Sequence, residues 1–170
     1  MHRRGEYVLV FAATVLLQAF LFDNLNLSPY LYPLIYVGFL LLLPTGMNHA
    51  LLILCGFVTG VTVDFLSGTA GLHTIASTAT AFIRPATINL TIGKDTANEN
   101  VMPLPINVGR GKWLKYAALA VSIHCIIFFC FEAATTAFLW YTLLRAAGSA
   151  LATFLLVWFA AVIYPVRGSH

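Results

Sequence analysis

The side chains that could support catalysis or metal binding are few, and their spacing forms no catalytic constellation. The 170 residues include five histidines, six acidic residues and three cysteines. No two histidines have the i, i+4 spacing of a helical metal site, and neither a G-x-S-x-G nucleophile motif nor a Walker loop occurs. Cys125 and Cys130 are five residues apart, and no C-x-x-C pair exists. The sequence therefore predicts no enzyme, no resident cofactor and no metal site.

A run of regularly spaced small residues is the most informative feature of the chain. Gly56, Gly60, Asp64 and Gly68 recur every four residues, so they share one face of a helix. Small-xxx-small spacing lets two membrane helices approach closely. Our main interpretation is internal packing against residues 72–83, whose side chains are equally small. Docking of a partner's helix and a ligand cleft are the alternatives.

Asp64 is an ionisable group at a predicted membrane boundary. Such a group often marks function or a specific partner. A boundary is wetter than the membrane centre, so a structural role in capping the following turn or in pairing is also reasonable. Arg145 is its predicted basic partner, and Glu132 could compete for Arg145. Gly71 belongs to the predicted turn, and His73 is expected to start the next helix. The candidate residues for partner binding or packing are therefore Gly56, Gly60, Asp64, Gly68, Gly71, His73, Arg84 and Arg145.

Composition places these side chains in a membrane. The chain is 60% hydrophobic and 9% charged, and its mean hydropathy is +0.88. An ordinary soluble domain is about 25% charged. So few charges cannot cover the surface of a soluble domain, which excludes a soluble enzyme and a disordered chain. We expect an all-α integral membrane protein, in which the mid-span His124 makes a core or interhelical hydrogen bond.

Six apolar runs predict a compact six-helix bundle forming one domain, because a helical span needs about 20 residues. The runs cover residues 7–22, 31–43, 50–63, 72–83, 113–131 and 143–164. The second run would cover only about 20 Å of a roughly 30 Å core, so it is either a short tilted helix or a re-entrant half-helix. A re-entrant second run would reduce the count to five. Arg84 and Pro85 are expected to stop the fourth run, and residues 86–112 form a polar loop.

The basic residues orient the predicted bundle, since basic residues are enriched in cytoplasmic loops. With six spans and a cytoplasmic N-terminus, Arg145 alone falls outside. The other eight fall inside: Arg3, Arg4, Arg84, Lys94, Arg110, Lys112, Lys115 and Arg167. The expected location is the bacterial inner membrane, with both termini and the 86–112 loop in the cytoplasm.

Several motifs occur together in a fixed order. The central ones are the glycine run, Asp64-Phe65-Leu66-Ser67-Gly68, and Gly71-Leu72-His73; the others are residues 17–22, 33–36, 81–85 and 141–145. In this order and spacing, the chain resembles the bacterial rod shape-determining protein family MreD over essentially its full length. Each piece alone is weak, whereas the combination is fairly specific.

The resemblance implies a non-enzymatic scaffold needed for rod shape and organised peptidoglycan synthesis. It also implies a partner, the membrane-anchored and mostly periplasmic protein MreC. MreC would link the chain to the actin-like MreB filament, the glycosyltransferase RodA and its transpeptidase. The lipid bilayer is the other expected partner, and no nucleic acid is expected.

The family is also similar, at a distance, to the six-helix substrate-binding components of vitamin importers. Such a component of a small-molecule transporter is the alternative function. Those proteins carry an A-x-x-x-A contact in their first helix. Here Ala12 and Ala13 are followed four residues later by Leu16 and Leu17, so that contact is missing.

Overall fold

The computed structural model of the protein describes residues 2–24, 31–97, 99–133 and 139–163. Over these residues the protein is all-helical, without a β-strand. Four helices are long and apolar enough to cross a membrane; they cover Gly5–Phe22, His49–Ser67, Arg110–Ala133 and Trp140–Ile163. The prediction of an α-helical membrane protein is confirmed at this level.

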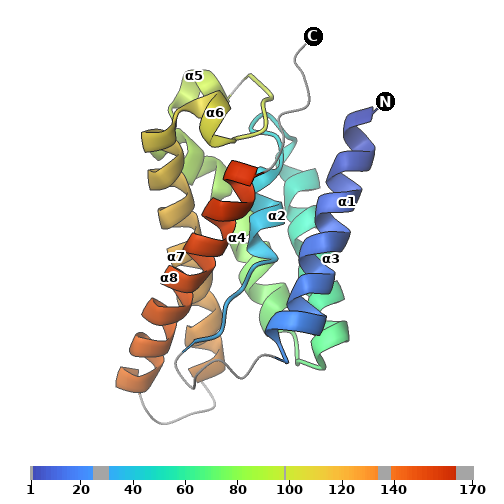
Figure 1. Ribbon diagram of the computed structural model, residues 1–170, viewed down its shortest axis with the longest axis vertical. Helices are drawn as coiled ribbons and strands as arrows, with labels where there is room; N and C mark the ends of the chain where they lie inside the picture. Colours follow the sequence, from blue (N-terminus) through green and yellow to red (C-terminus); the bar gives the residue numbers. More distant parts are fainter. Residues whose placement is uncertain (1, 25–30, 98, 134–138, 164–170) are drawn as a thin grey trace.

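The long helices lie side by side along the long axis of the molecule (Figure 1). In chain order they are α1 (His2–Leu16), α3 (His49–Ser67), α4 (Leu72–Thr91), α7 (Arg110–Ala133) and α8 (Leu139–Ile163). α4 lies between α3 and α7, and α7 packs against α8. The α3–α4 pair is therefore joined to the α7–α8 pair through the central helix α4.

The second apolar run is not a continuous helix. Residues 31–36 are non-helical, and α2 comprises only Val37–Leu42. The run enters the bundle at the end where α1 finishes and leads to α2 in the middle of the molecule (Figure 1). It reaches the opposite end, where Thr45 N donates a hydrogen bond to Val101 O. Residues 31–44 are called the broken segment below.

The fourth predicted span is longer than expected, and the prediction that Arg84 and Pro85 stop it is wrong. α4 continues through Pro85 to Thr91. A proline removes one backbone N–H from a helix, but membrane helices tolerate this where neighbouring groups bind the freed carbonyls. The carbonyl that Pro85 leaves without an intrahelical donor is that of Ala81, and the next carbonyl, Phe82 O, accepts from His49 Nε2 at 3.1 Å. The neighbouring helix thus contacts α4 beside the proline.

The polar loop predicted at residues 86–112 is consequently shorter and mostly folded. It contains α5 (Lys94–Ala97) and α6 (Pro105–Val108), and α7 already begins at Arg110. Both short helices lie at the end of the bundle where α1 begins (Figure 1). Tyr164, the predicted end of the last span, and Arg167 lie outside the described residues.

Candidate functional site

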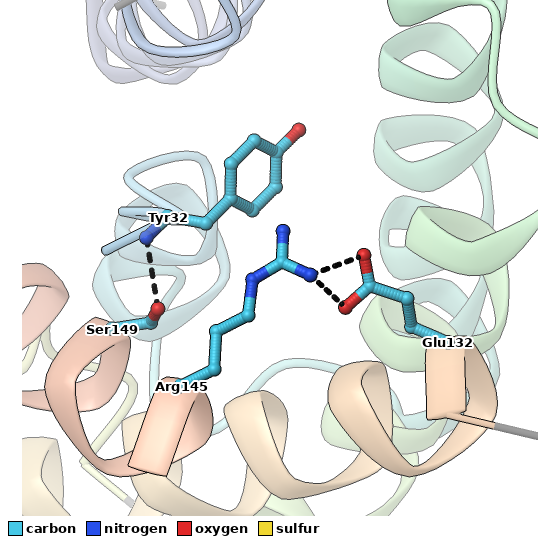
Figure 2. A network of polar contacts seen from close by, with 4 residues as sticks. All are labelled: Tyr32, Glu132, Arg145 and Ser149. Atoms are coloured by element: carbon cyan, nitrogen blue, oxygen red, sulfur yellow. Dashed lines mark hydrogen bonds and ion pairs between the residues drawn. The ribbon is translucent and has the colours of Figure 1, made fainter. Parts of the chain in front are cut away.

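Two side chains of α8 hold the extended part of the broken segment. Ser149 Oγ accepts a hydrogen bond from Tyr32 N, and Thr153 Oγ1 accepts one from Leu34 N, each at 2.9 Å. Figure 2 shows the first of these contacts. Ser149 and Thr153 are four residues apart and therefore share one face of the helix. Non-helical backbone at membrane depth is tolerated only where its polar groups find such partners.

A glutamine from the end of the first helix completes this support. Residues Leu17–Phe22 form a π-helical turn, η1, and Gln18 within it is fully buried. Gln18 Oε1 accepts from Ile35 N at 2.9 Å, and Gln18 Nε2 donates to Pro33 O at 3.2 Å and to Asp23 Oδ1 at 2.7 Å. Tyr32 Oη donates to the same Asp23 oxygen at 2.7 Å. Two elements, η1 with the Asp23 that follows it and α8, thus hold one stretch of extended chain.

An arginine holds the other end of the broken segment. Arg84 Nε donates to Tyr116 Oη at 2.8 Å, and its two terminal nitrogens donate to Leu41 O at 3.2 Å, to Pro44 O at 3.3 Å and to Leu43 O. These carbonyls lie at the C-terminal end of α2, the negative end of the helix dipole. The guanidinium therefore caps the short helix from the side.

Arg84 was counted among the charges that orient the bundle and was also a candidate for packing, and the structure shows a packing role. The side chain is only 1% exposed. No carboxylate forms an ion pair with it among the residues that the structure describes. Arginine can occupy such a site because its planar fork offers five N–H donors to several acceptors at once.

Asp64 caps the start of α4 from the end of α3. One carboxylate oxygen accepts from Thr69 Oγ1 at 2.5 Å and from His73 N at 3.1 Å, and the other accepts from Thr74 N at 2.8 Å and from Thr74 Oγ1 at 2.5 Å. The His73 and Thr74 amides belong to the first turn of α4, where backbone N–H groups have no intrahelical partner. The structure therefore gives Asp64 the capping role that was one of its two interpretations.

The turn between α3 and α4 depends on two glycines. Gly68 ends α3 with φ of 67°, and Gly71 precedes α4 with φ of 89°. Both values lie in the left-handed region that side chains other than hydrogen rarely adopt. The predicted turn is present, and its shape brings Asp64 over the start of α4.

The glycine face of α3 packs internally against α4. A Cβ atom added at Gly56 would lie 2.7 Å from Ala81 Cβ and 2.8 Å from Ser77 O, and one at Gly60 would overlap Thr74 Cα and Ser77 Oγ. Ser77 Oγ also donates to Gly56 O at 2.8 Å. Because α4 fills this face, it offers no surface to a partner or a ligand.

Arg145 pairs with Glu132, so the predicted pairing with Asp64 is wrong. Arg145 Nη1 lies 2.9 Å from each Glu132 carboxylate oxygen, and the guanidinium lies over the Tyr32 ring, 5.9 Å from its centroid (Figure 2). Glu132 lies in the last turn of α7 and Arg145 lies in the first two turns of α8, so the two residues are near neighbours. The oxygens of Asp64 are meanwhile taken by the start of α4.

A buried hydrogen-bonded cluster links the broken segment to α4 and α7. Tyr36 Oη lies 2.9 Å from His124 Nε2 and 3.0 Å from His73 Nδ1, and Thr80 Oγ1 lies 3.0 Å from His124 Nδ1. All four side chains are buried. The expected interhelical hydrogen bond of His124 is therefore confirmed.

The predicted site residues do not gather at one point. Arg84 lies in the C-terminal half of α4, away from the Gly68–Gly71 turn, and Arg145 lies on α8. The others lie on or between α3 and α4: Gly56, Gly60, Asp64, Gly68, Gly71 and His73. The sequence analysis missed the side chains that hold the broken segment, although each is a polar residue within an apolar run: Gln18, Ser149, Thr153 and Tyr116.

An open apolar cavity of about 380 Å³ lies between α1 and α3 and is floored by α2. Its walls include Val8, Phe11, Phe39, Leu54, Cys55 and Val58. This cavity is called the α1–α3 cleft below. Among the described residues, no three His, Cys, Asp or Glu side chains form a group that could hold a metal ion.

Comparison with known proteins adds no relative to this description. No protein-family model, no curated protein and no solved structure matches the chain.

Proposed function

We propose that this chain is a non-enzymatic scaffold of the bacterial cell-elongation machinery, needed for rod shape and organised peptidoglycan synthesis, and that it binds MreC. The observation that carries the proposal is the α1–α3 cleft. It is lined by apolar side chains, and its wall residues Leu54 and Val58 are about half exposed. In a bilayer, such a recess is open to the membrane helix of a partner.

The size of the cleft suits side chains of a partner helix rather than the helix itself. A helix with its side chains is about 10–12 Å across, which is too wide for a recess of about 380 Å³. We infer that apolar side chains of the MreC membrane anchor insert between α1 and α3. Through MreC, the chain would join MreB, RodA and the transpeptidase.

The interior of the bundle also supports a scaffold. Buried polar groups of Gln18, Asp64 and Arg84 bind backbone of the same chain. Their hydrogen-bonding capacity is thus used to hold the broken segment and the α3–α4 turn, not to present a reactive group. The resemblance to the MreD family points to the same kind of function.

Filling the cleft provides the test. We expect Val58→Trp to lower MreC recovery in co-purification about tenfold, since a well-placed interface residue contributes more than 1 kcal/mol. Leu155→Trp is the matched control, because Leu155 is exposed to a similar degree but lies on α8. Both variants should reach wild-type abundance in the membrane.

Two outcomes would contradict this proposal in different ways. Full MreC recovery with Val58→Trp would remove the cleft as the docking surface. Failure of the wild-type chain to recover MreC at all would remove the scaffold function.

The proposed topology is six crossings of the inner membrane with both termini in the cytoplasm. The crossings would be α1 with η1, the broken segment, α3, α4, α7 and α8. Support comes from their alternating directions and from the position of α5 and α6 at the end where α1 begins (Figure 1). Lys94 in that connection and Arg110 and Lys112 in the first turn of α7 lie at the same end, as the positive-inside rule predicts.

A reporter that is active only outside the inner membrane tests this topology. Inserted between α5 and α6, it should stay inactive, and inserted beside Asp23, at the opposite end of the bundle, it should be active. An active reporter between α5 and α6 would overturn the orientation. An inactive reporter beside Asp23 would overturn the six-crossing count.

The substrate-binding component of a vitamin-type transporter is the second candidate. The broken segment favours it, because interrupted helices near the bilayer midplane often line transporter sites. Depletion in the bacterium that carries this chain separates the two functions. A scaffold predicts that rods become spheres without a nutrient requirement, whereas a transporter predicts a nutrient requirement with normal shape.

A further inference from the structure

The start of α7 carries three cations that no contact described above explains. Arg110, Lys112 and Lys115 lie within its first two turns, and all three are exposed. None of them forms an ion pair with a carboxylate among the residues that the structure describes. The first turn holds no acidic residue, although the N-terminal end of a helix favours negative charge. Positive charge is therefore concentrated here without a partner of opposite sign.

The positive-inside rule accounts for basic residues at this end of the bundle, but not for their register on α7. Lys112 and Lys115 are three residues apart, so they share one face of the helix. Ala118 lies three residues and Ile126 three turns after Lys115, so both continue that face, and both are exposed. The charged start of the face thus leads into an apolar surface that meets lipid tails in a bilayer.

The length of this face suits one leaflet of a bilayer. Lys115 and Ile126 are eleven positions apart in the chain, which is about 16 Å along a helix axis. One leaflet contributes about 15 Å of hydrocarbon, half of the roughly 30 Å core. A phospholipid lying along α7 therefore contacts the cations with its headgroup and Ile126 with the ends of its chains.

A neighbouring side chain favours a lipid over a soluble acidic partner. α6 packs against α7 and exposes 70% of Ile106 at the same end of the molecule (Figure 1). A large apolar side chain in water beside a group of cations is unfavourable, whereas the boundary of a membrane accepts both. Positive charge next to apolar surface is the combination that binds an anionic lipid surface.

We propose that Arg110, Lys112 and Lys115 bind the headgroup of an anionic phospholipid, whose chains lie along the exposed face of α7. The phosphate oxygens accept hydrogen bonds from the guanidinium and ammonium groups, and the negative charge of the lipid offsets the three cations. This site is called the α7 lipid site below. It does not depend on the proposed scaffold function, because the α1–α3 cleft lies between other helices.

Lipid retention by the full-length chain, without a partner, tests the α7 lipid site. The chain is placed in nanodiscs with equal amounts of anionic phosphatidylglycerol and zwitterionic phosphatidylcholine. After transfer to detergent, native mass spectrometry counts the lipids that stay bound. Each basic residue near a membrane surface strengthens binding of anionic lipid about fivefold, so three should give a preference for phosphatidylglycerol of about tenfold or more.

Two triple variants with the same net charge separate this site from general attraction to the basic end. The first combines Arg110→Gln, Lys112→Gln and Lys115→Gln and should lose most of the preference. The second should keep the preference, because it removes three charges from other elements at the same end. Its substitutions are Arg3→Gln, Arg4→Gln and Lys94→Gln.

Three results would overturn the proposal. The first is equal retention of the two lipids by the wild-type chain. The second is an equal loss of preference in both triple variants, because attraction to the basic end would then be sufficient. The third is release of phosphatidylglycerol by soluble glycerophosphoglycerol, because the headgroup alone would then occupy the site. The first and third readouts use the wild-type chain, so they decide the matter even if a triple variant fails to fold.

Discussion

Arg84→Ala is expected to destabilise the chain by roughly 3–5 kcal/mol. The substitution leaves the carbonyls of Leu43 and Pro44 without their buried donor, at about 1–3 kcal/mol each, and it opens a cavity beside α2. Leu41 O is less affected, because Tyr116 Oη also donates to it at 3.1 Å. The thermal unfolding midpoint in detergent and the level in the membrane should both fall.

Two matched variants separate this role from a role in orienting the bundle. Arg110→Ala removes an exposed basic residue from the same polar end and should leave unfolding unchanged. Arg84→Lys keeps the charge but loses the fork of donors, so its midpoint should fall between those of wild type and Arg84→Ala. Wild-type unfolding of Arg84→Ala would show that the buried guanidinium does not hold α2.

The α3–α4 hairpin could be predicted from the sequence because its determinants are local. The four-residue spacing of Gly56 and Gly60 indicates a close helix contact, and the later glycines indicate a turn. The amides that Asp64 caps are only nine and ten residues away along the chain. Contacts between residues this close along the chain can be inferred from local sequence patterns. A capping role was therefore among the interpretations of Asp64.

The support of the broken segment could not be predicted in the same way. Tyr32 and Ser149 are 117 positions apart, and Leu34 and Thr153 are 119 positions apart. No periodicity links backbone amides to hydroxyl groups at such a distance. The polar residues inside apolar runs indicated where partners were needed, but not which backbone groups they would bind.

The burial of Arg84 and its backbone partners could not be predicted for a related reason. Counting basic residues assumes that each one lies in water at the membrane surface. A buried arginine in a helix that continues past a proline breaks that assumption. Its true partners, the carbonyls at the end of α2, exist only because the second run breaks into a short helix.

Gly60→Ala should be the second most damaging substitution, at or above the upper end of the about 1–3 kcal/mol typical of overpacking. The added methyl group would overlap Thr74 Cα and lie 2.7 Å from His73 O, and neither backbone atom can rotate away. α3 and α4 must therefore separate, which also weakens the Asp64 cap. The unfolding midpoint and the membrane level should both fall.

Gly111→Ala is the control, because a Cβ atom there meets nothing within 4 Å and should be neutral or slightly stabilising. If the chain binds MreC as proposed, the MreC recovered with Gly60→Ala should fall only in proportion to the amount of the variant, since the glycine face packs against α4. A variant at wild-type level that has lost MreC would instead place the partner on this face. Such a result would contradict the packing of this face against α4, because one glycine face cannot pack against α4 and against MreC at the same time. The α1–α3 cleft would then no longer be needed to explain binding.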